Sequence, residues 1–132
     1  MYSKDMLIGM FLSKAGYDIA VSRKEEYKLG YNFTLSIRIS GEEEFLLAVK
    51  RSLLQHEIEC TICKWGRAYV LLIRKQSSVS NLLDLLPNLP DSKNKVKVFK
   101  KLIKMIKNKE HLTLEGAEYI MKIKGVIEHG TD

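Results

Sequence analysis

Residues 31–40 read Tyr-Asn-Phe-Thr-Leu-Ser-Ile-Arg-Ile-Ser, a run in which polar and apolar side chains alternate. Neighbouring side chains of a β-strand point to opposite faces of a sheet, so this alternation predicts a strand with one buried face. The predicted inner positions are Phe33, Leu35, Ile37 and Ile39, and the predicted outer positions are Asn32, Thr34, Ser36 and Arg38. Residues 18–23 alternate in the same way, and the polar segment 24–30 between the two runs predicts an antiparallel hairpin.

The rest of the chain predicts helices around a second hairpin. Ser3 can cap a helix over about residues 4–15, and Gly41 separates the 31–40 strand from a helix over 42–55. Residues 58–64 and 68–74 predict a second hairpin, and further helices are predicted over 77–86, 96–108 and 113–127. This order indicates an α+β fold in which four strands form one antiparallel sheet covered on one face by helices.

Composition predicts one domain, residues 1–132, because 45% of the 132 residues are hydrophobic and can form a core. No apolar run approaches the roughly 20 residues that span a bilayer, and residues 1–7 lack the features of a secretory signal. We therefore expect an intracellular protein, cytoplasmic or organellar, without a membrane partner. The net charge of +6 suits a polyanion partner, and the basic segment 93–109 contains no acid; it predicts either phosphate contacts or a solvated helix face.

Three stretches of the chain resemble the LAGLIDADG homing endonucleases. Residues 7–11, LIGMF, correspond to the start of the motif helix, and residues 27–31, YKLGY, are similar to the entry of the second strand in that family. Residues 99–101, FKK, and 108–116, NKEHLTLEG, resemble a stretch near the end of many single-motif members. The resemblance covers nearly the whole chain and implies an αββαββα domain with a four-stranded antiparallel sheet.

In that family two motif helices pack together, and this chain has one. The resemblance therefore implies a homodimer, or pairing with another single-motif chain, on a roughly palindromic site. Gly9 and Ser13 lie one turn apart and, with Leu12, would form the subunit contact. The alternative is that Gly9 is a packing glycine inside a monomer.

The position of the family's metal-binding acid falls on Lys14, and the other usual acid position falls on Leu12. An ammonium group cannot ligate Mg²⁺, which prefers oxygen ligands, so the resemblance predicts no metal and no catalytic residue. Asp18 is the one nearby acid that is a candidate to substitute, and the alternative is that it is an ordinary surface or turn residue. Lys14 could instead contact a phosphate.

The resemblance implies that the outer face of the sheet contacts DNA, with alternate strand residues meeting bases and phosphates. The candidate contacts on the first hairpin are Ser22, Lys24, Asn32, Thr34, Ser36 and Arg38, and those on the second are Lys64, Arg67, Arg74 and Lys75. The predicted helix over 96–108, called the lysine helix below, adds Lys97, Lys100, Lys101 and Lys104. On the second hairpin, however, we expect Val70 and Leu72, joined by Glu57 and Glu59, on this outer face. Apolar and acidic groups suit phosphate poorly and favour weak DNA contact or a protein contact.

These observations predict a catalytically inactive protein that binds double-stranded DNA as a dimer without a cofactor. A second hypothesis is an active endonuclease that uses Mg²⁺ with noncanonical acids or with an acid-bearing partner chain. A third is an RNA-binding, intron maturase-like module or a protein-interaction module. Two weaker signals are set aside: Cys60 and Cys63 form a single pair, too few for zinc, and the three histidines, His56, His111 and His129, form no nucleophile–base arrangement.

Overall fold

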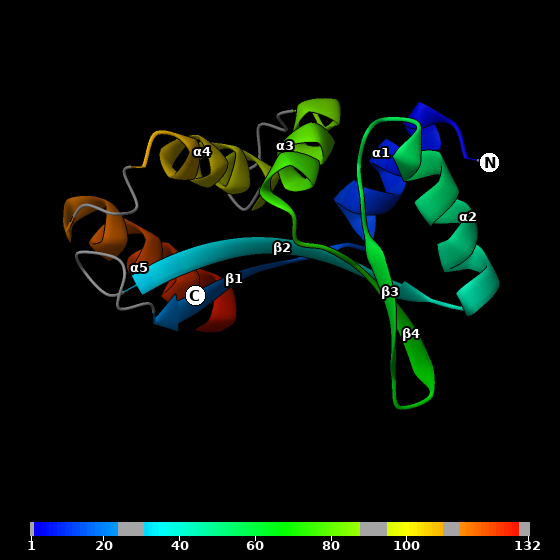
Figure 1. The fold of residues 1–132 in the computed structure, drawn as a ribbon, viewed down its shortest axis with the longest axis horizontal. Coiled ribbons are helices and arrows are strands. Elements are labelled where there is room, and N and C mark those ends of the chain that lie inside the picture. Colours follow the sequence, from blue (N-terminus) through cyan, green and yellow to red (C-terminus); the bar gives the residue numbers. More distant parts are fainter. Residues whose placement is uncertain (1, 24–30, 88–94, 110–113, 130–132) are drawn as a thin grey trace.

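The chain forms five described helices around one sheet, in the order expected from the sequence (Figure 1). The computed structural model describes residues 2–23, 31–87, 95–109 and 114–129, with the backbone alone at 21–23, 31–32, 95, 114 and 125–129. The elements are α1 (Lys4–Ser13), β1 (Gly16–Arg23), β2 (Tyr31–Gly41), α2 (Glu43–Leu54), β3 (Thr61–Trp65), β4 (Ala68–Ile73), α3 (Gln76–Leu85), α4 (Lys95–Lys107) and α5 (Leu114–His129). The predicted α+β class is confirmed, and element ends differ from the predictions by a few residues.

The four strands form one antiparallel sheet in the order β1-β2-β4-β3, which confirms the predicted single sheet. In the β1–β2 hairpin Tyr17 pairs with Ile37 and Ile19 pairs with Leu35. The strand begins at Gly16, two residues earlier than predicted, because the buried Tyr17 continues the inward-facing row of Ile19. β4 joins the two hairpins, with Leu71 opposite Ile39 of β2 and Ile62 of β3.

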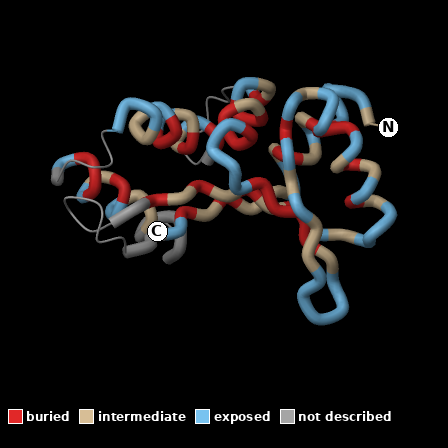
Figure 2. Tube along the Cα trace, viewed as in Figure 1, coloured by how far each residue is buried: buried red, intermediate tan, exposed pale blue. Residues whose placement is uncertain are grey.

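The hydrophobic core lies between the sheet and the helices. Phe33, Leu35, Ile37 and Ile39 are all buried, as the alternation predicted. In Figure 1 the helices α1 to α4 lie on one side of the sheet, and the β3–β4 hairpin projects to the other side. α2 packs on β2, β3 and β4, α3 and α4 pack on β2, and α5 packs on β1. Figure 2 shows the buried segments concentrated where these helices meet the strands.

Tyr17 joins α1, the sheet and α4 at the start of β1. Its hydroxyl donates a 2.6 Å hydrogen bond to the carbonyl oxygen of Phe11, and its ring meets the Phe99 ring edge-on at a centroid distance of 5.2 Å. Burial raises the pKa of Tyr17 from 10.0 to about 12, because the phenolate would lose its hydration. The folded protein therefore favours the neutral phenol.

This shift predicts a loss of stability at high pH. The folded-state pKa lies above the unfolded one, so the stabilisation is fully present below about pH 10 and is lost as the pH rises towards 12. We expect the free energy of unfolding, measured with urea from about pH 9 to pH 11.5, to fall more steeply for the wild type than for Tyr17→Phe. Parallel curves for the two proteins would show that Tyr17 ionises as easily folded as unfolded.

Candidate nucleic-acid interface

The outer face of the sheet is polar at one end and apolar at the other. Because directly paired residues of an antiparallel sheet point to the same side, the register defines this face. On β1 and β2 it carries Asp18, Ala20, Thr34, Ser36, Arg38 and Ser40. On β3 and β4 it carries Thr61, Cys63, Trp65, Ala68, Val70 and Leu72. The polar end has the hydrogen-bonding groups that can meet base edges and phosphates, as the alternation of β2 predicted.

Arg38 and Asp18 form an ion pair on the polar end of this face. Arg38 lies opposite Gly16 in the register, and Asp18 lies opposite Ser36, so the two charges approach diagonally across the hairpin. A Cβ atom at Gly16 would lie 3.1 Å from Nε and Cζ of Arg38, so the absence of a side chain at position 16 lets the guanidinium group cross the β1 backbone. Both side chains remain partly exposed, at 43% and 42%.

The ion pair changes what both residues can do. The resemblance suggested Arg38 for base contacts and Asp18 as a substitute metal ligand, and the structure brings the two together. A pair this exposed contributes only about 0–1 kcal/mol, so DNA phosphates or bases can compete for Arg38. Asp18, by contrast, has a guanidinium group where a metal ligand needs an open coordination position.

Lys14 occupies the end of α1 as its C-cap residue. Its backbone N–H donates to the carbonyl oxygen of Met10 at 2.8 Å, and its ammonium group lies 5.9 Å from the centre of the Phe45 ring. The available donors here are therefore an ammonium group and a carboxylate paired with arginine, a set that does not fit Mg²⁺. Within the described ranges, no three His, Cys, Asp or Glu side chains gather as a metal site would require.

Two of the three predicted contact residues of α1, Gly9 and Ser13, are exposed. A Cβ atom at Gly9 would meet nothing within 4 Å, and the Ser13 hydroxyl donates back to the carbonyl oxygen of Gly9 at 2.7 Å. Leu12 is half-buried against the core. Within the described residues, Gly9 therefore packs against no other part of the chain, which disfavours its reading as a core glycine.

The second hairpin differs from the prediction in two ways. Val70 and Leu72 do point to the outer face, but each is only 5% exposed, on a strand that has β2 on one side and β3 on the other. Glu57 and Glu59 do not extend that face. They precede β3 and lie beside α3, where the Glu57 carbonyl accepts from Asn81 and the Glu59 N–H donates to the Ser78 hydroxyl.

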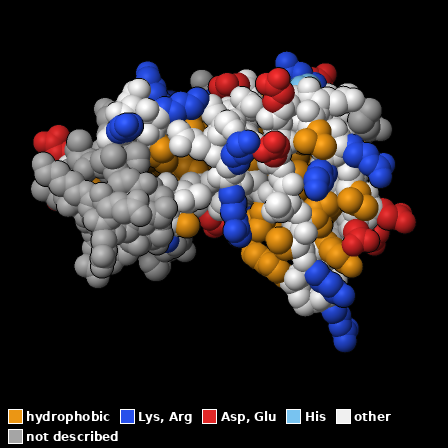
Figure 3. All heavy atoms as spheres, viewed as in Figure 1, with side chains coloured by type: hydrophobic (Ala, Val, Ile, Leu, Met, Phe, Trp, Pro, Cys, Tyr) orange, Lys and Arg blue, Asp and Glu red, His pale blue; other side chains and the backbone are white. Residues whose placement is uncertain are grey.

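The cations of this hairpin occupy different places. Lys64 shares the helix-bearing side with Tyr69, and its ammonium group lies 5.9 Å from that ring. Lys75 is paired at 2.8 Å with Glu59. Arg67 and Arg74 are exposed at the two ends of β4. Figure 3 shows Lys and Arg side chains at the free end of the hairpin, beyond the hydrophobic side chains around its base.

The lysine helix lies on the opposite side of the sheet from the outer face. α4 buries Phe99 and Leu102 in the core and so belongs to the helical layer. Lys100 donates to the Leu86 carbonyl and Lys107 to the Ser80 hydroxyl, both at 2.5 Å, which ties α4 to α3 and the residue after it. Lys97 and Lys104 are exposed on α4. The α4 lysines suggested by the resemblance therefore cannot join the strand residues in one continuous surface.

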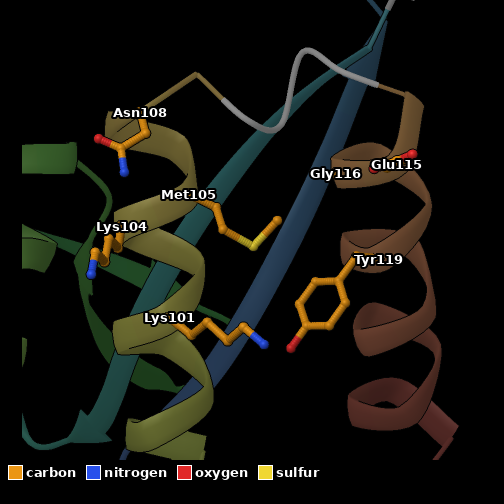
Figure 4. Close-up of a pocket in the computed structure, with 7 residues that line it drawn as sticks. All are labelled: Lys101, Lys104, Met105, Asn108, Glu115, Gly116 and Tyr119. Atoms are coloured by element: carbon orange, nitrogen blue, oxygen red, sulfur yellow. The ribbon is translucent and has the colours of Figure 1, made fainter.

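A groove of about 720 Å³ lies between α4 and α5 in this helical layer. Figure 4 shows Lys101, Met105 and Tyr119 converging in it, with the Lys101 ammonium group 4.6 Å from the centre of the Tyr119 ring. Its other lining residues are Lys104, Asn108, Glu115 and Gly116. The described lining holds one carboxylate, from Glu115, and no nucleophile–base pair.

Some sequence-based candidates cannot be placed. Lys24 and His111 lie outside the described residues, and for Ser22, Asn32 and His129 the backbone alone is described. Burial raises the pKa of Cys60 to about 11, against a smaller opposing effect of Lys50, so its thiol is protonated at neutral pH. The sequence analysis missed Trp65 as a surface residue. Its strand alternates too weakly to assign a face.

Comparison with solved structures identifies the fold. No protein-family model matches the chain, and no curated protein does. The homing endonuclease I-TnaI superimposes with a TM-score of 0.82 at 24% identity, over 98% of this chain and 90% of its own. I-SmaMI bound to an uncleaved DNA target with calcium ions gives 0.81 at 18% identity, over 100% and 47% of the two chains. The LAGLIDADG homing endonuclease I-LtrWI bound to target DNA gives 0.77 at 20%, over 95% and 44%.

The chain thus has the fold of the LAGLIDADG homing endonucleases. It spans nearly all of I-TnaI and somewhat less than half the length of I-SmaMI and I-LtrWI. Within the described ranges, no helix is both long and apolar enough to cross a membrane.

Proposed function

We propose that this protein binds double-stranded DNA inside the cell through the outer face of its sheet, as a dimer joined along α1, and that it does not cleave the DNA. The observation that carries the proposal is the ion pair between Asp18 and Arg38. The pair keeps a cation on the face that would meet DNA and occupies Asp18, the first acid after α1 along the chain. The pair therefore supports binding through this face over metal coordination by Asp18.

DNA as the partner is supported by the fold and by the outer face. I-SmaMI and I-LtrWI, which share the fold, have each been solved bound to DNA. The polar strand positions Thr34, Ser36 and Arg38 lie in a row at alternate residues of β2, which suits contacts along a groove. The net charge of +6 also favours a polyanion such as DNA as the partner.

A dimer is supported by the composition and burial of α1. The helix reads Lys-Asp-Met-Leu-Ile-Gly-Met-Phe-Leu-Ser, and apolar residues surround its axis. A helix that is apolar on every side is normally buried on every side. Here the chain fully buries only Leu7 and Phe11, while Met6 is 51% exposed and Gly9 faces open space. A second copy of α1 would cover this face, and the glycine would allow close approach of the two backbones.

The enzyme alternative makes a different demand on Asp18. A divalent metal between two subunits would need a carboxylate from each, and Asp18 would have to release Arg38 to supply it. Wild-type protein is therefore incubated with Mg²⁺ or Mn²⁺ and plasmid carrying a site selected from a randomised duplex pool. We expect no linear or nicked product. Product that disappears in Asp18→Asn would instead establish an endonuclease that uses this carboxylate.

The same variant tests the binding role of Arg38. Asp18→Asn removes the charge that competes for Arg38, so we expect the affinity for a fluorescein-labelled 30-bp duplex to rise about 2- to 5-fold at moderate salt. Arg38→Gln should lower the affinity and reduce the slope of log affinity against log salt by about one. Both variants should fold normally, because the pair is exposed. Unchanged affinity in both would place the DNA elsewhere on the molecule.

A further inference from the structure

The free end of the β3–β4 hairpin carries an unexplained aromatic side chain. Trp65 is the last residue of β3 and pairs with Ala68, the first residue of β4, across a turn formed by Gly66 and Arg67. Gly66, the first residue of the turn, has φ +62°. Short two-residue hairpin turns favour glycine at this position, because it adopts a positive φ. The turn is therefore tight, and it holds Trp65 at the tip of a hairpin that projects beyond the rest of the sheet (Figure 1).

The indole ring of Trp65 is left open by the chain. Trp65 is 54% exposed and is the only tryptophan in the sequence. Its cross-strand partner is Ala68, whose methyl group covers little of a ring. Lys64 and Tyr69, the next pair along the hairpin, lie on the other side. Among the described aromatic residues, the close ring pairs are Tyr2 with Phe45 and Tyr17 with Phe99, and neither involves Trp65. A large apolar group held in water at a rigid tip suggests a partner.

The charges around Trp65 indicate which partner. Arg67 lies in the turn next to Trp65, and the sequence from Cys60 to Leu83 contains no Asp or Glu. The acids near the turn are Glu42 and Glu43, where α2 begins, which line a pocket with Arg67, Ala68 and Tyr69. A partner that fits this tip must carry negative charge and also present a flat apolar surface. Nucleic acid combines the two, because its phosphates surround the π-faces of its bases. Trp65 also lies on the outer face that would meet DNA.

We propose that Trp65 acts as a wedge that stacks on a base of the bound duplex, with Arg67 on a neighbouring phosphate. This inference rests on the proposed function, since it needs the duplex on the outer face. In a regular DNA duplex each base is stacked between its neighbours, so Trp65 must partly unstack one base step to insert. Pyrimidine–purine steps open most easily, and the tip would therefore favour such a step at the edge of the binding site without hydrogen bonds to it.

Because the chain has one tryptophan, its fluorescence reports on this position alone. Labelled duplex is titrated with protein by anisotropy, and Trp65 emission is followed in parallel with unlabelled duplex. We expect quenched emission, protection from acrylamide, and brighter 2-aminopurine placed at the opened step. Trp65→Ala should weaken binding about 5- to 100-fold, whereas Trp65→Phe, which keeps an aromatic face, should lose less.

Two controls separate stacking from charge and from general apolar exposure. Arg67→Gln should weaken binding and lower its salt dependence while Trp65 emission is still quenched at saturation. Leu54→Ala changes a comparably exposed apolar residue on α2, on the helical side, and should change neither readout. Circular dichroism of Trp65→Ala should match the wild type, because the side chain lies at the tip and not in the core.

The outcomes distinguish this inference from the proposed function. If anisotropy shows binding but Trp65 emission and acrylamide access stay unchanged, the wedge is wrong and DNA binding stands. If no duplex binds at all, both fall. Emission that changes with protein concentration in the absence of DNA would place Trp65 in a contact between subunits, and would also overturn the wedge.

Discussion

Replacing Gly9 by arginine is expected to abolish dimer formation and to lower the affinity for duplex DNA at least about 100-fold, because each monomer would hold only half of the site. The chain itself has room for the new side chain: a Cβ atom at position 9 meets nothing within 4 Å. A second α1 helix packed against this face would not have that room. Sedimentation equilibrium gives the association state, and anisotropy with labelled duplex gives the affinity.

Two variants make this result specific. Gly9→Ala should raise the free energy of unfolding of the monomer by up to about 1 kcal/mol, since alanine favours a helix interior over glycine. The same change should weaken the dimer. Leu47→Arg introduces the same charge on an exposed position of α2 and should leave association unchanged. A Gly9→Arg protein that still sediments as a dimer would show that the subunits meet elsewhere.

Replacing Phe99 by alanine is expected to lower the free energy of unfolding by about 3–5 kcal/mol. Phe99 is completely buried and packs edge-on against Tyr17, so it joins α4 to the sheet. The loss would be a large part of the roughly 5–15 kcal/mol that stabilises a typical domain. Urea unfolding followed by circular dichroism at 222 nm measures it.

The control for this change lies two residues away. Lys97 is exposed on the same helix, and Lys97→Ala should change the free energy of unfolding by no more than about 0.5 kcal/mol. A loss below about 1 kcal/mol in Phe99→Ala would mean that α4 is not an essential part of the core.

Periodicity in the sequence was sufficient to predict the helices and strands, and to predict which face of the regular strands is buried. The alternation of residues 31–40 identified the buried and exposed faces of β2, and the stripe containing Phe99 and Leu102 identified the buried side of α4. The order of helices and hairpins, together with the resemblance to the LAGLIDADG homing endonucleases, was sufficient to predict the fold. These features are local, because the side-chain period of an element is set by its own backbone geometry.

The contacts between elements required the tertiary structure. Asp18 and Arg38 each have an outer position from alternation alone, but their pairing depends on the register, and the seven-residue segment between the strands does not determine it. Likewise, the period of β4 places Val70 and Leu72 on the outer face without showing that neighbouring strands cover them.

The same limit applies to the lysine helix and to Lys14. The sequence by itself determined that the segment of α4 is rich in lysine and that Lys14 follows the first helix. Only the tertiary structure decided that α4 lies in the helical layer, with Lys100 and Lys107 bound to the region of α3, and that the nearest acid to Lys14 along β1 is paired with Arg38. Periodicity shows which side of an element is polar, whereas the partner of that side depends on how distant segments pack.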